Sequence, residues 1–310
     1  MSAGASHAPP AKGRPMTLSR LQEKKALGEP IAMVTAYDHP SATVAEEAGV
    51  DLVLVGDSAA NTVLGYPSTV PVSLDEMLML AAAVRRGLTR PLLIGDLPFG
   101  SYEVSNEQAV KSAQRFVKEA GCDAVKLERG GTSAARARAI VEAGIPVMGH
   151  VGLTPQTATA LGGYRSQGRT AERALEVARD ALALQDAGCF AVVFEAVPGE
   201  LTGLVVPRMR VPVIGIGAGP ATDGQVLVFH DLLRIREGHF ARFVKHYANV
   251  REQMVAGVRA FSEEVRARRY PEPEHGYTMA PDELERLRAL MDQVDVGYPH
   301  GEPFTGGASL

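Results

Sequence analysis

The chain has 310 residues, of which 45% are hydrophobic, and its formal net charge is -4. This length suits one large domain or two small ones, and the composition is typical of a globular protein with a sizeable core. No block rich in Lys and Arg is present, which argues against nucleic acid or an anionic membrane as a partner. No apolar run approaches the roughly 20 residues that span a bilayer. Two cysteines and no secretory pattern predict a cytoplasmic location.

Composition divides the chain into three predicted parts. Residues 1–15 are rich in Pro, Gly and Ala and predict a disordered tail. Residues 16–270 alternate helix and strand patterns and form the predicted catalytic domain. Residues 271–310 predict an exposed extension with one short helix, to which the sequence assigns no role.

The predicted elements begin with a helix in MTLSRLQEKKALGE, which starts at Met16. Eight short apolar runs follow, and each is typical of a strand that is buried on both faces. In chain order they are IAMVTAYD, LVLV, PLLIGDLPF, AVKLE, PVMGH, AVVFE, VPVIGIGAG and VLVFHD.

Helical patterns separate most of these runs. The stretch SLDEMLMLAAAVRRG begins with Ser73 and has Glu76 three residues later, which is a capping box; Ser105 and Gln108 repeat the spacing. A long amphipathic pattern starts at Thr170. Two connections fit less well: VPRMRVP leaves only a short sixth helix, and ATDGQ between the last two strands has no room for one.

Eight such units over about 240 residues predict an α/β fold, a closed (β/α)8 barrel. An open, doubly wound parallel sheet is the alternative. In the barrel, the helix before the first strand would plug the floor. The carboxyl ends of all eight strands would meet at one rim, where the active sites of such barrels lie.

Three acids follow successive predicted strands: Asp57, Asp96 and Glu128. Neighbouring strands lie about 4.8 Å apart, so these carboxylates are expected to converge and to repel one another. A hard divalent cation would remove that repulsion, and oxygen ligands favour Mg²⁺ or Mn²⁺ over Zn²⁺. Any one of these acids taken alone could instead cap a helix or form a loop salt bridge.

Three further ionisable residues lie at or near strand ends. Glu195 has apolar neighbours, which would raise its pKa and suit a general base, although a structural pairing with Arg165 or Lys126 is an equal alternative. Lys126 points the same way as Glu128 by strand alternation, so it would either neutralise the acids or bind a substrate carboxylate. His150 ends the fifth predicted strand, where a lone histidine is more often a hydrogen-bonded core residue than a catalyst.

A set of ordered motifs between about residues 16 and 275 resembles one enzyme family. They are TAYDHPSA, LVGDSAANTVLGYPSTVPV, GDLPFGSY, AVKLE, GHVGLTPQ, LGGYRSQGR, FEAVP and VIGIGAGPATDGQVLVFHD. Together they look like the ketopantoate hydroxymethyltransferases. This resemblance implies a (β/α)8 barrel that moves a one-carbon unit from 5,10-methylenetetrahydrofolate to 3-methyl-2-oxobutanoate, in pantothenate and coenzyme A biosynthesis.

The resemblance also implies roles for individual residues. The family's Mg²⁺ ligands fall on Asp57, Asp96 and Glu128. Its keto-acid contacts fall on Asp57, Ser58, Asp96 and Lys126.

The family's general base falls on Glu195, and His150 matches a histidine that lines the site. A homo-oligomer, commonly a decamer in the family, is implied as well. The folate-binding residues are not revealed by the motifs.

One position departs from the family pattern Val-Lys-x-Glu-Gly-Gly, because AVKLERGG has Arg129 in place of the first glycine. If that position has a positive φ, the arginine strains the turn; otherwise it adds a cation beside the metal site.

Two rival functions stay open at this point. A barrel lyase or mutase of the isocitrate lyase and phosphoenolpyruvate mutase type also uses Mg²⁺ and a keto-acid enolate. Its catalytic cysteine would have to lie at the mouth, whereas Cys122 and Cys189 begin predicted strands. A non-catalytic ligand-binding barrel is the second rival, and Arg129 is the feature that favours it.

Overall fold

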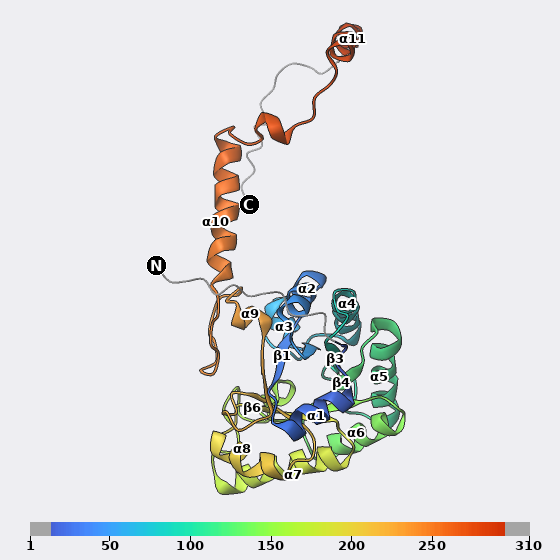
Figure 1. The fold of residues 1–310 in the computed structure, drawn as a ribbon, viewed down its shortest axis with the longest axis vertical. Helices are drawn as coiled ribbons and strands as arrows, with labels where there is room; N and C mark the ends of the chain where they lie inside the picture. Colours follow the sequence, from blue (N-terminus) through green and yellow to red (C-terminus); the bar gives the residue numbers. More distant parts are fainter. Residues whose placement is uncertain (1–13, 295–310) are drawn as a thin grey trace, which may run out of the picture. The chain divides into compact units, whose positions relative to one another are not determined.

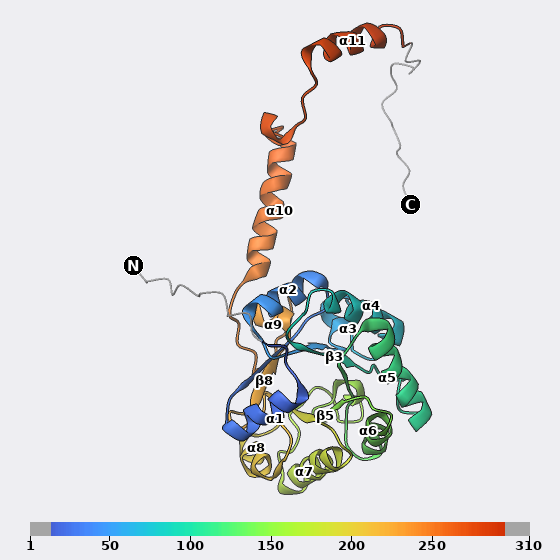
Figure 2. The same cartoon turned by 45° about the vertical axis from the view of Figure 1, so that its right-hand side comes forward.

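The computed structural model describes residues 14–294, so the tail predicted over residues 1–15 lies outside the described residues except for Arg14 and Pro15. Eight parallel strands form a closed barrel in the order β1 to β8, and each strand pairs with its neighbours in sequence while β8 pairs with β1. Figure 1 and Figure 2 show the helices around these strands. The predicted (β/α)8 barrel is therefore confirmed, and the open sheet is wrong.

The strands are short and almost wholly buried. They are β1 Ile31–Thr35, β2 Leu52–Val55, β3 Leu92–Asp96, β4 Ala124–Lys126, β5 Val147–Gly152, β6 Ala191–Glu195, β7 Val213–Ile216 and β8 Gly224–Leu227. The α-helices of the barrel unit are α1 Leu18–Leu27, α2 His39–Ala48, α3 Ala59–Thr62, α4 Leu74–Arg85, α5 Asn106–Ala120, α6 Thr132–Glu142, α7 Ala171–Asp186, α8 Gly199–Val205 and α9 Phe229–Leu232. Two 3₁₀ turns, Pro155–Thr157 and Val206–Arg208, complete the set.

The described chain divides into two compact units, with the boundary after Arg251. The second unit contains most of α10 Val250–Arg266, the 3₁₀ turn Pro273–His275 and α11 Pro281–Met291. None of the described helices combines the length and the apolar character that crossing a bilayer would require.

Alternation along each strand separates two apolar layers. The inner layer fills the barrel with residues such as Leu52, Ile94, Met148 and Ile214. The outer layer, which includes Leu93, joins the strands to the surrounding helices. Because successive side chains point to opposite faces of a strand, any polar residue in phase with the inner layer must point into the barrel.

Helix α1 closes the floor of the barrel, as the sequence predicted. Its Leu21 is 1% exposed and belongs to the inner apolar layer. Thr17 caps the first turn, and Gly28 ends the helix in the left-handed conformation with φ 68. Both caps satisfy backbone groups that a helix end otherwise leaves unpaired.

Three aspartates at the floor each join a backbone N–H to a cation. Asp51 accepts from the N–H of Ala32 and pairs with Lys24. Asp223 accepts from the N–H of Val213 and pairs with Lys25. Asp123 accepts from the N–H of Leu93 and pairs with Arg85. Carboxylates with such partners stabilise the folded barrel.

The last strand is shorter than its sequence pattern predicts. The run VLVFHD continues to Asp231, but β8 ends at Leu227, and Phe229 already lies in α9. The reason is a hydrogen bond that turns the chain, because the N–H of Phe229 donates to Thr35 Oγ1 at 2.9 Å. The link from β7 to β8 contains no helix, as ATDGQ predicted.

Glu46 on α2 ties that helix to the start of β3, and its removal should weaken the barrel. Arg90 Nε and Thr89 Oγ1 donate to Glu46 Oε1 at 2.6 and 2.7 Å. Burial opposes ionisation of Glu46, but these hydrogen bonds outweigh it and lower its pKa to about 2. Glu46→Gln should therefore cost about 1–2 kcal/mol of unfolding free energy at pH 7, allowing for partial exposure.

The pH dependence of this contribution has a defined sign. Since the folded pKa of Glu46 lies below the unfolded value of 4.5, the stabilisation is complete above pH 4.5 and is lost as the pH falls toward about 2. Urea denaturation of both proteins at pH 7 and at pH 3 measures the difference. Glu47→Gln, an exposed change on the same helix, is the control; equal effects of the two substitutions would contradict the assignment.

Candidate active site

The predicted site residues do meet at the carboxyl rim of the barrel. Asp96 ends β3 and Lys126 ends β4, and the register pairs these two residues directly. Glu195 ends β6 and pairs with Gly152 at the end of β5. Asp96, Lys126 and Glu195 are in phase with the inner apolar layer, so their side chains turn inward. Strand phase thus brings acids and a lysine from three strands to one mouth.

Asp57 and Asp96 face each other across the end of β2. The backbone N–H of Asp57 donates to Asp96 Oδ2 at 3.0 Å. Burial, and then the charges of Asp96 and Glu128, raise the pKa of Asp57 well above its ordinary value. Burial likewise raises the pKa of Asp96, although Lys126 opposes it. Uptake of a proton or a cation by this pair would therefore reduce the repulsion between the two carboxylates.

Lys126 is the internal counter-charge of this acid group. Its Nζ lies 2.9 Å from Asp96 Oδ1 and 3.6 Å from Glu128 Oε1. Burial alone would lower the pKa of Lys126, but the attraction of Asp96, Glu128 and Asp57 outweighs it and keeps the pKa above its ordinary value. The lysine therefore stays positively charged in the mouth, as both interpretations of the sequence required.

His150 links the acid group to Glu195. Its Nδ1 lies 3.3 Å from Glu128 Oε1, and its Nε2 lies 3.3 Å from Glu195 Oε2. Burial and Lys126 lower the pKa of His150, but its contacts with the carboxylates of Glu128 and Glu195 outweigh them and raise it to about 9. The ring lies between the two carboxylates and can orient both, and its Nδ1 also lies 3.4 Å from Lys126 Nζ.

Ser58 also reaches the mouth, and it has a partner that the sequence did not indicate. Tyr37 OH and Ser58 Oγ are 2.8 Å apart. Tyr37 is fully buried, so it fixes the position of the serine hydroxyl.

The sequence interpretation missed Gln156, which connects two of the acids. Its side-chain Nε2 donates to Asp57 Oδ2 at 3.2 Å, and its backbone N–H donates to Glu128 Oε2 at 3.1 Å. Tyr102 OH donates to Gln156 Oε1 at 2.7 Å and accepts from the N–H of Glu128. The only signal in the sequence is the polar residue in GHVGLTPQ, a loop with no periodic pattern.

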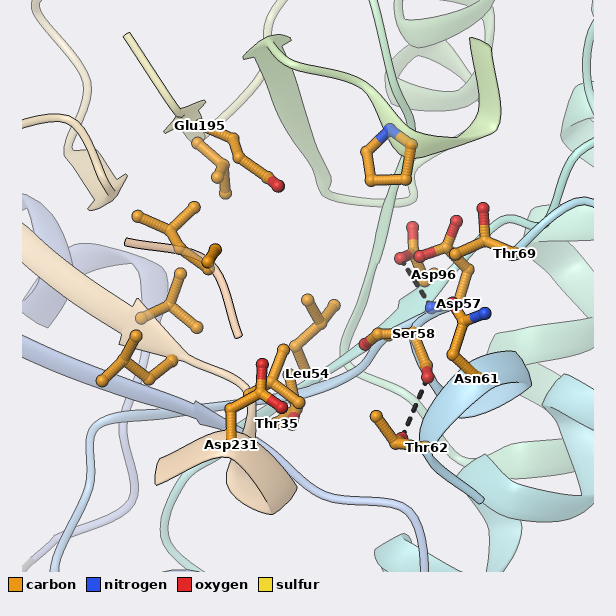
Figure 3. Close-up of a pocket in the computed structure, with 18 of the residues that line it drawn as sticks. Thr35, Leu54, Asp57, Ser58, Asn61, Thr62, Thr69, Asp96, Glu195 and Asp231 are labelled. Atoms are coloured by element: carbon orange, nitrogen blue, oxygen red, sulfur yellow. Dashed lines mark hydrogen bonds between the residues drawn. The ribbon is translucent and has the colours of Figure 1, made fainter. Parts of the chain in front are cut away.

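One cavity of about 450 Å³ is lined by the predicted site residues, which are Asp57, Ser58, Asp96, Lys126, Glu128, His150 and Glu195. Figure 3 shows Asp57 and Asp96 together with Ser58, while Glu195 lies across the pocket from them. This size suits a small organic ligand. The arrangement separates the three clustered acids from Glu195, which stands apart, and from Asp231, which lines another part of the cavity.

A family model described as ketopantoate hydroxymethyltransferase matches residues 15–273. The chain belongs to this family. The resemblance inferred from the ordered motifs is therefore confirmed.

Curated relatives of the ketopantoate hydroxymethyltransferase family match over most of the chain. A 3-methyl-2-oxobutanoate hydroxymethyltransferase of Carboxydothermus hydrogenoformans is 49% identical, covering 88% of this chain and 99% of the relative. One of Streptomyces avermitilis is 53% identical over 84% of this chain and 91% of its own. A mitochondrial enzyme of that name from Arabidopsis thaliana is 51% identical, over 87% and 80%.

Solved structures with this fold include enzymes of another kind. Phosphonopyruvate hydrolase in complex with oxalate and Mg²⁺ matches with a TM-score of 0.55 at 16% identity, covering 90% of this chain and 99% of that one. A 2,3-dimethylmalate lyase of the PEP mutase and isocitrate lyase superfamily matches at 0.51 and 17%, over 90% and 97%. At these identities the likeness shows a shared barrel fold and no more.

The acid group of this family member suits a hard divalent cation. Asp96 Oδ1 and Glu128 Oε1 are buried and accept no hydrogen bond, so the contacts with Lys126 are ion pairs without hydrogen-bond geometry. Orphaned carboxylate oxygens and the raised pKa of Asp57 are the signs of a site that a cation would complete.

The spacing of the acids is nevertheless wider than that of a closed metal cage. Among the described residues, one group of three acid or histidine side chains has ligand atoms all within 4.8 Å, and it is the exposed set Glu272, Glu274 and His275. The predicted triad does not meet that distance. Of the three acids, Asp57 and Asp96 are linked directly, because the backbone N–H of Asp57 donates to Asp96 Oδ2.

Arg129, which replaces the family glycine, has a positive φ of 70. The predicted strain is therefore present. The arginine is exposed and does not line the cavity, so it adds no cation beside the acids. Ala196, the residue after Glu195, shows the same feature with φ 49. Two of the acids at the mouth, Glu128 and Glu195, are thus each followed by a residue in the left-handed conformation.

Arg129→Gly should be more stable than Arg129→Ala by about 1 kcal/mol, because only glycine adopts a positive φ without steric cost. Both variants lack the arginine side chain, so the difference in stability between them reports the backbone conformation and not the lost side chain. Lys118, exposed on α5, is the control, since there the Gly variant should be the less stable of the two. Thermal and urea unfolding measure both pairs, and the same ordering at both positions would refute the strain.

Proposed function

We propose that this chain transfers a hydroxymethyl group from 5,10-methylenetetrahydrofolate to 3-methyl-2-oxobutanoate, giving 2-dehydropantoate and tetrahydrofolate with uptake of one water. The supporting observation is the split of the mouth into a clustered acid group and one separate acid, Glu195, held by His150. It occurs in a chain about half identical to enzymes of that name.

The first step assigned to the protein is removal of the C3 proton of the keto acid. Glu195 lies across the pocket from the acid group, so a substrate held there would present C3 toward it. A carboxylate that holds a metal is a poor base, whereas Glu195 is free of that task. His150 keeps the Glu195 carboxylate oriented.

The remaining residues bind the keto acid and offset its charge. Lys126 is a buried cation beside the place where the substrate carboxylate and the growing enolate charge would lie, and the His150 ring lies next to it. Ser58, fixed by Tyr37, offers a hydroxyl donor to the substrate carboxylate. Asp57 and Asp96 would hold Mg²⁺, which when bound supplies a Lewis acid for the keto oxygen.

The new C–C bond then joins C3 of the keto acid to the methylene carbon of the folate donor. The electron pair left on C3 after proton removal forms this bond as the methylene carbon separates from one of its two donor nitrogens. Water then replaces the second nitrogen on that carbon and so supplies the oxygen of the hydroxymethyl group. The two nitrogens take up the C3 proton and one proton of the water, and tetrahydrofolate leaves. The rival lyase reaction would instead break a C–C bond without a folate. The solved hydrolase and lyase structures, at 16% and 17% identity, support only a shared fold and not this rival reaction.

A direct assay tests this proposal. Purified protein is incubated with keto acid, donor and Mg²⁺, and both products are quantified; each component is then left out in turn. Equal amounts of 2-dehydropantoate and tetrahydrofolate are expected only in the complete mixture. Binding of the keto acid without turnover would favour the ligand-binding barrel. A cytoplasmic location stays a prediction, since the Arabidopsis relative is named mitochondrial. The homo-oligomer also stays a prediction.

A further inference from the structure

The cavity at the mouth continues past the acid group to a second end. This end is formed by the end of β8 and the chain that follows it, and its lining includes Val226, Leu227, Phe243 and Val244. The keto acid is much smaller than a cavity of about 450 Å³, so the acid end accounts for only part of the space. The second end is therefore available to another ligand.

The lining of this second end combines the polar side chains of Asp231, Arg236 and His239 with an apolar wall, and that wall is well fixed. Phe243 lies so close to Gly217 that a Cβ at Gly217 would stand 2.4 Å from the ring. Gly217 has φ 63, so the close approach and the backbone conformation both require glycine there. A ring held in this way offers a flat apolar surface, which suits a planar heterocycle.

One carboxylate, Asp231, lies at this second end. Its side chain is only 13% exposed and lines the cavity. Figure 3 shows it beside Thr35, apart from Asp57 and Asp96 and apart from Glu195. Its Oδ1 pairs with Arg236 Nε, and no hydrogen bond to Oδ2 is seen within the described part of the chain. Asp231 thus keeps acceptor capacity toward the cavity.

Five carboxylates line the cavity, and four of them already have tasks: Asp57, Asp96, Glu128 and Glu195. The donor must enter this same cavity, because its methylene carbon has to reach C3 of the keto acid. The pterin ring of a reduced folate presents a 2-amino group and an N3–H side by side. Two parallel N–H donors of this kind match one carboxylate.

We propose that Asp231 binds the 2-amino-4-oxo edge of the pterin ring, with the ring against the apolar wall formed by Val226, Leu227 and Phe243. This inference rests on the proposed function, since it assigns the subsite of the folate donor. Asp231 is then the residue that selects a pterin over other carriers. The competing explanation is that Asp231 only holds the chain turn through Arg236.

A ligand pair tests the contact itself. Pterin and lumazine differ at position 2, where lumazine has an oxo group in place of the amino group. As competitors of the donor, pterin should inhibit at least about tenfold more tightly than lumazine, because lumazine leaves an acceptor facing Asp231. In Asp231→Asn this preference should fall to near one, and the KM for the donor should rise about tenfold or more.

Arg236→Gln is the matched control, since it breaks the same ion pair from the other side. It should keep the preference for pterin. Equal loss in the two variants, or an unchanged preference in Asp231→Asn, would overturn the assignment. Exchange of the keto-acid C3 proton in deuterated water needs no donor and should persist in both variants. If the parent protein forms no 2-dehydropantoate, the proposed function itself fails, which is a separate result.

Discussion

Glu195→Gln is expected to abolish exchange of the C3 proton of 3-methyl-2-oxobutanoate with deuterated water and to lower kcat by about 10²–10⁴-fold. The amide keeps the shape of the side chain and can still contact His150, but it cannot accept a proton from carbon. Binding of the keto acid with Mg²⁺ should therefore survive. Proton NMR of the exchange and calorimetric titration of the keto acid separate the two effects.

Glu200→Gln is the control for this substitution, because Glu200 is exposed on the neighbouring helix α8. It should leave both exchange and turnover unchanged. Undiminished exchange in Glu195→Gln would remove Glu195 from the role of base. Loss of keto-acid binding in the same variant would instead place Glu195 among the binding residues.

Asp96→Asn is expected to remove the response of the protein to Mg²⁺ and to lower kcat at least about 10²-fold. Asp96 contacts both Asp57 and Lys126, so the substitution removes one charge from the repelling pair and one partner from the lysine. The stability of the metal-free protein should change less than its metal response, because the lost repulsion and the lost ion pair offset each other.

Thermal unfolding with a chelator and with added Mg²⁺ measures that response. The parent protein should melt higher with Mg²⁺, since a ligand that binds only the folded state stabilises it. Asp96→Asn should show the same melting temperature in both conditions. Asp75→Asn, an exposed change whose partner is Arg115, should keep the full response. Full activity of Asp96→Asn without raised Mg²⁺ would refute the metal site.

Strand periodicity predicted much of this site, because the position of a residue along a strand decides whether its side chain points into the barrel or outward. The inward positions of Asp96, Lys126 and Glu195 follow from alternation along buried strands, and closure of the barrel brings their ends together. The conditional prediction for Arg129 was also resolved by one dihedral angle. Where a regular element fixes a residue, the sequence was sufficient.

Residues in loops escaped prediction for the opposite reason. Gln156 lies in a single 3₁₀ turn and Tyr102 lies between β3 and α5, where no period relates sequence to direction, and their contacts depend on how these segments pack. Asp231 was seen as the end of a strand, but a hydrogen bond to Thr35 ends β8 earlier and places it on a short helix. The partners of the acids therefore had to come from the structure.

Substitutions of the aspartates at the floor and of those at the rim should harm this barrel in different ways. At the floor, Asp51 and Asp223 join backbone N–H groups to lysines, so replacing them loosens the fold. At the rim, Asp57 and Asp96 repel each other. A mutant library scored separately for cellular abundance and for growth without pantothenate should sort them cleanly. Floor substitutions would be cleared by proteolysis, whereas rim substitutions would persist as abundant, inactive protein.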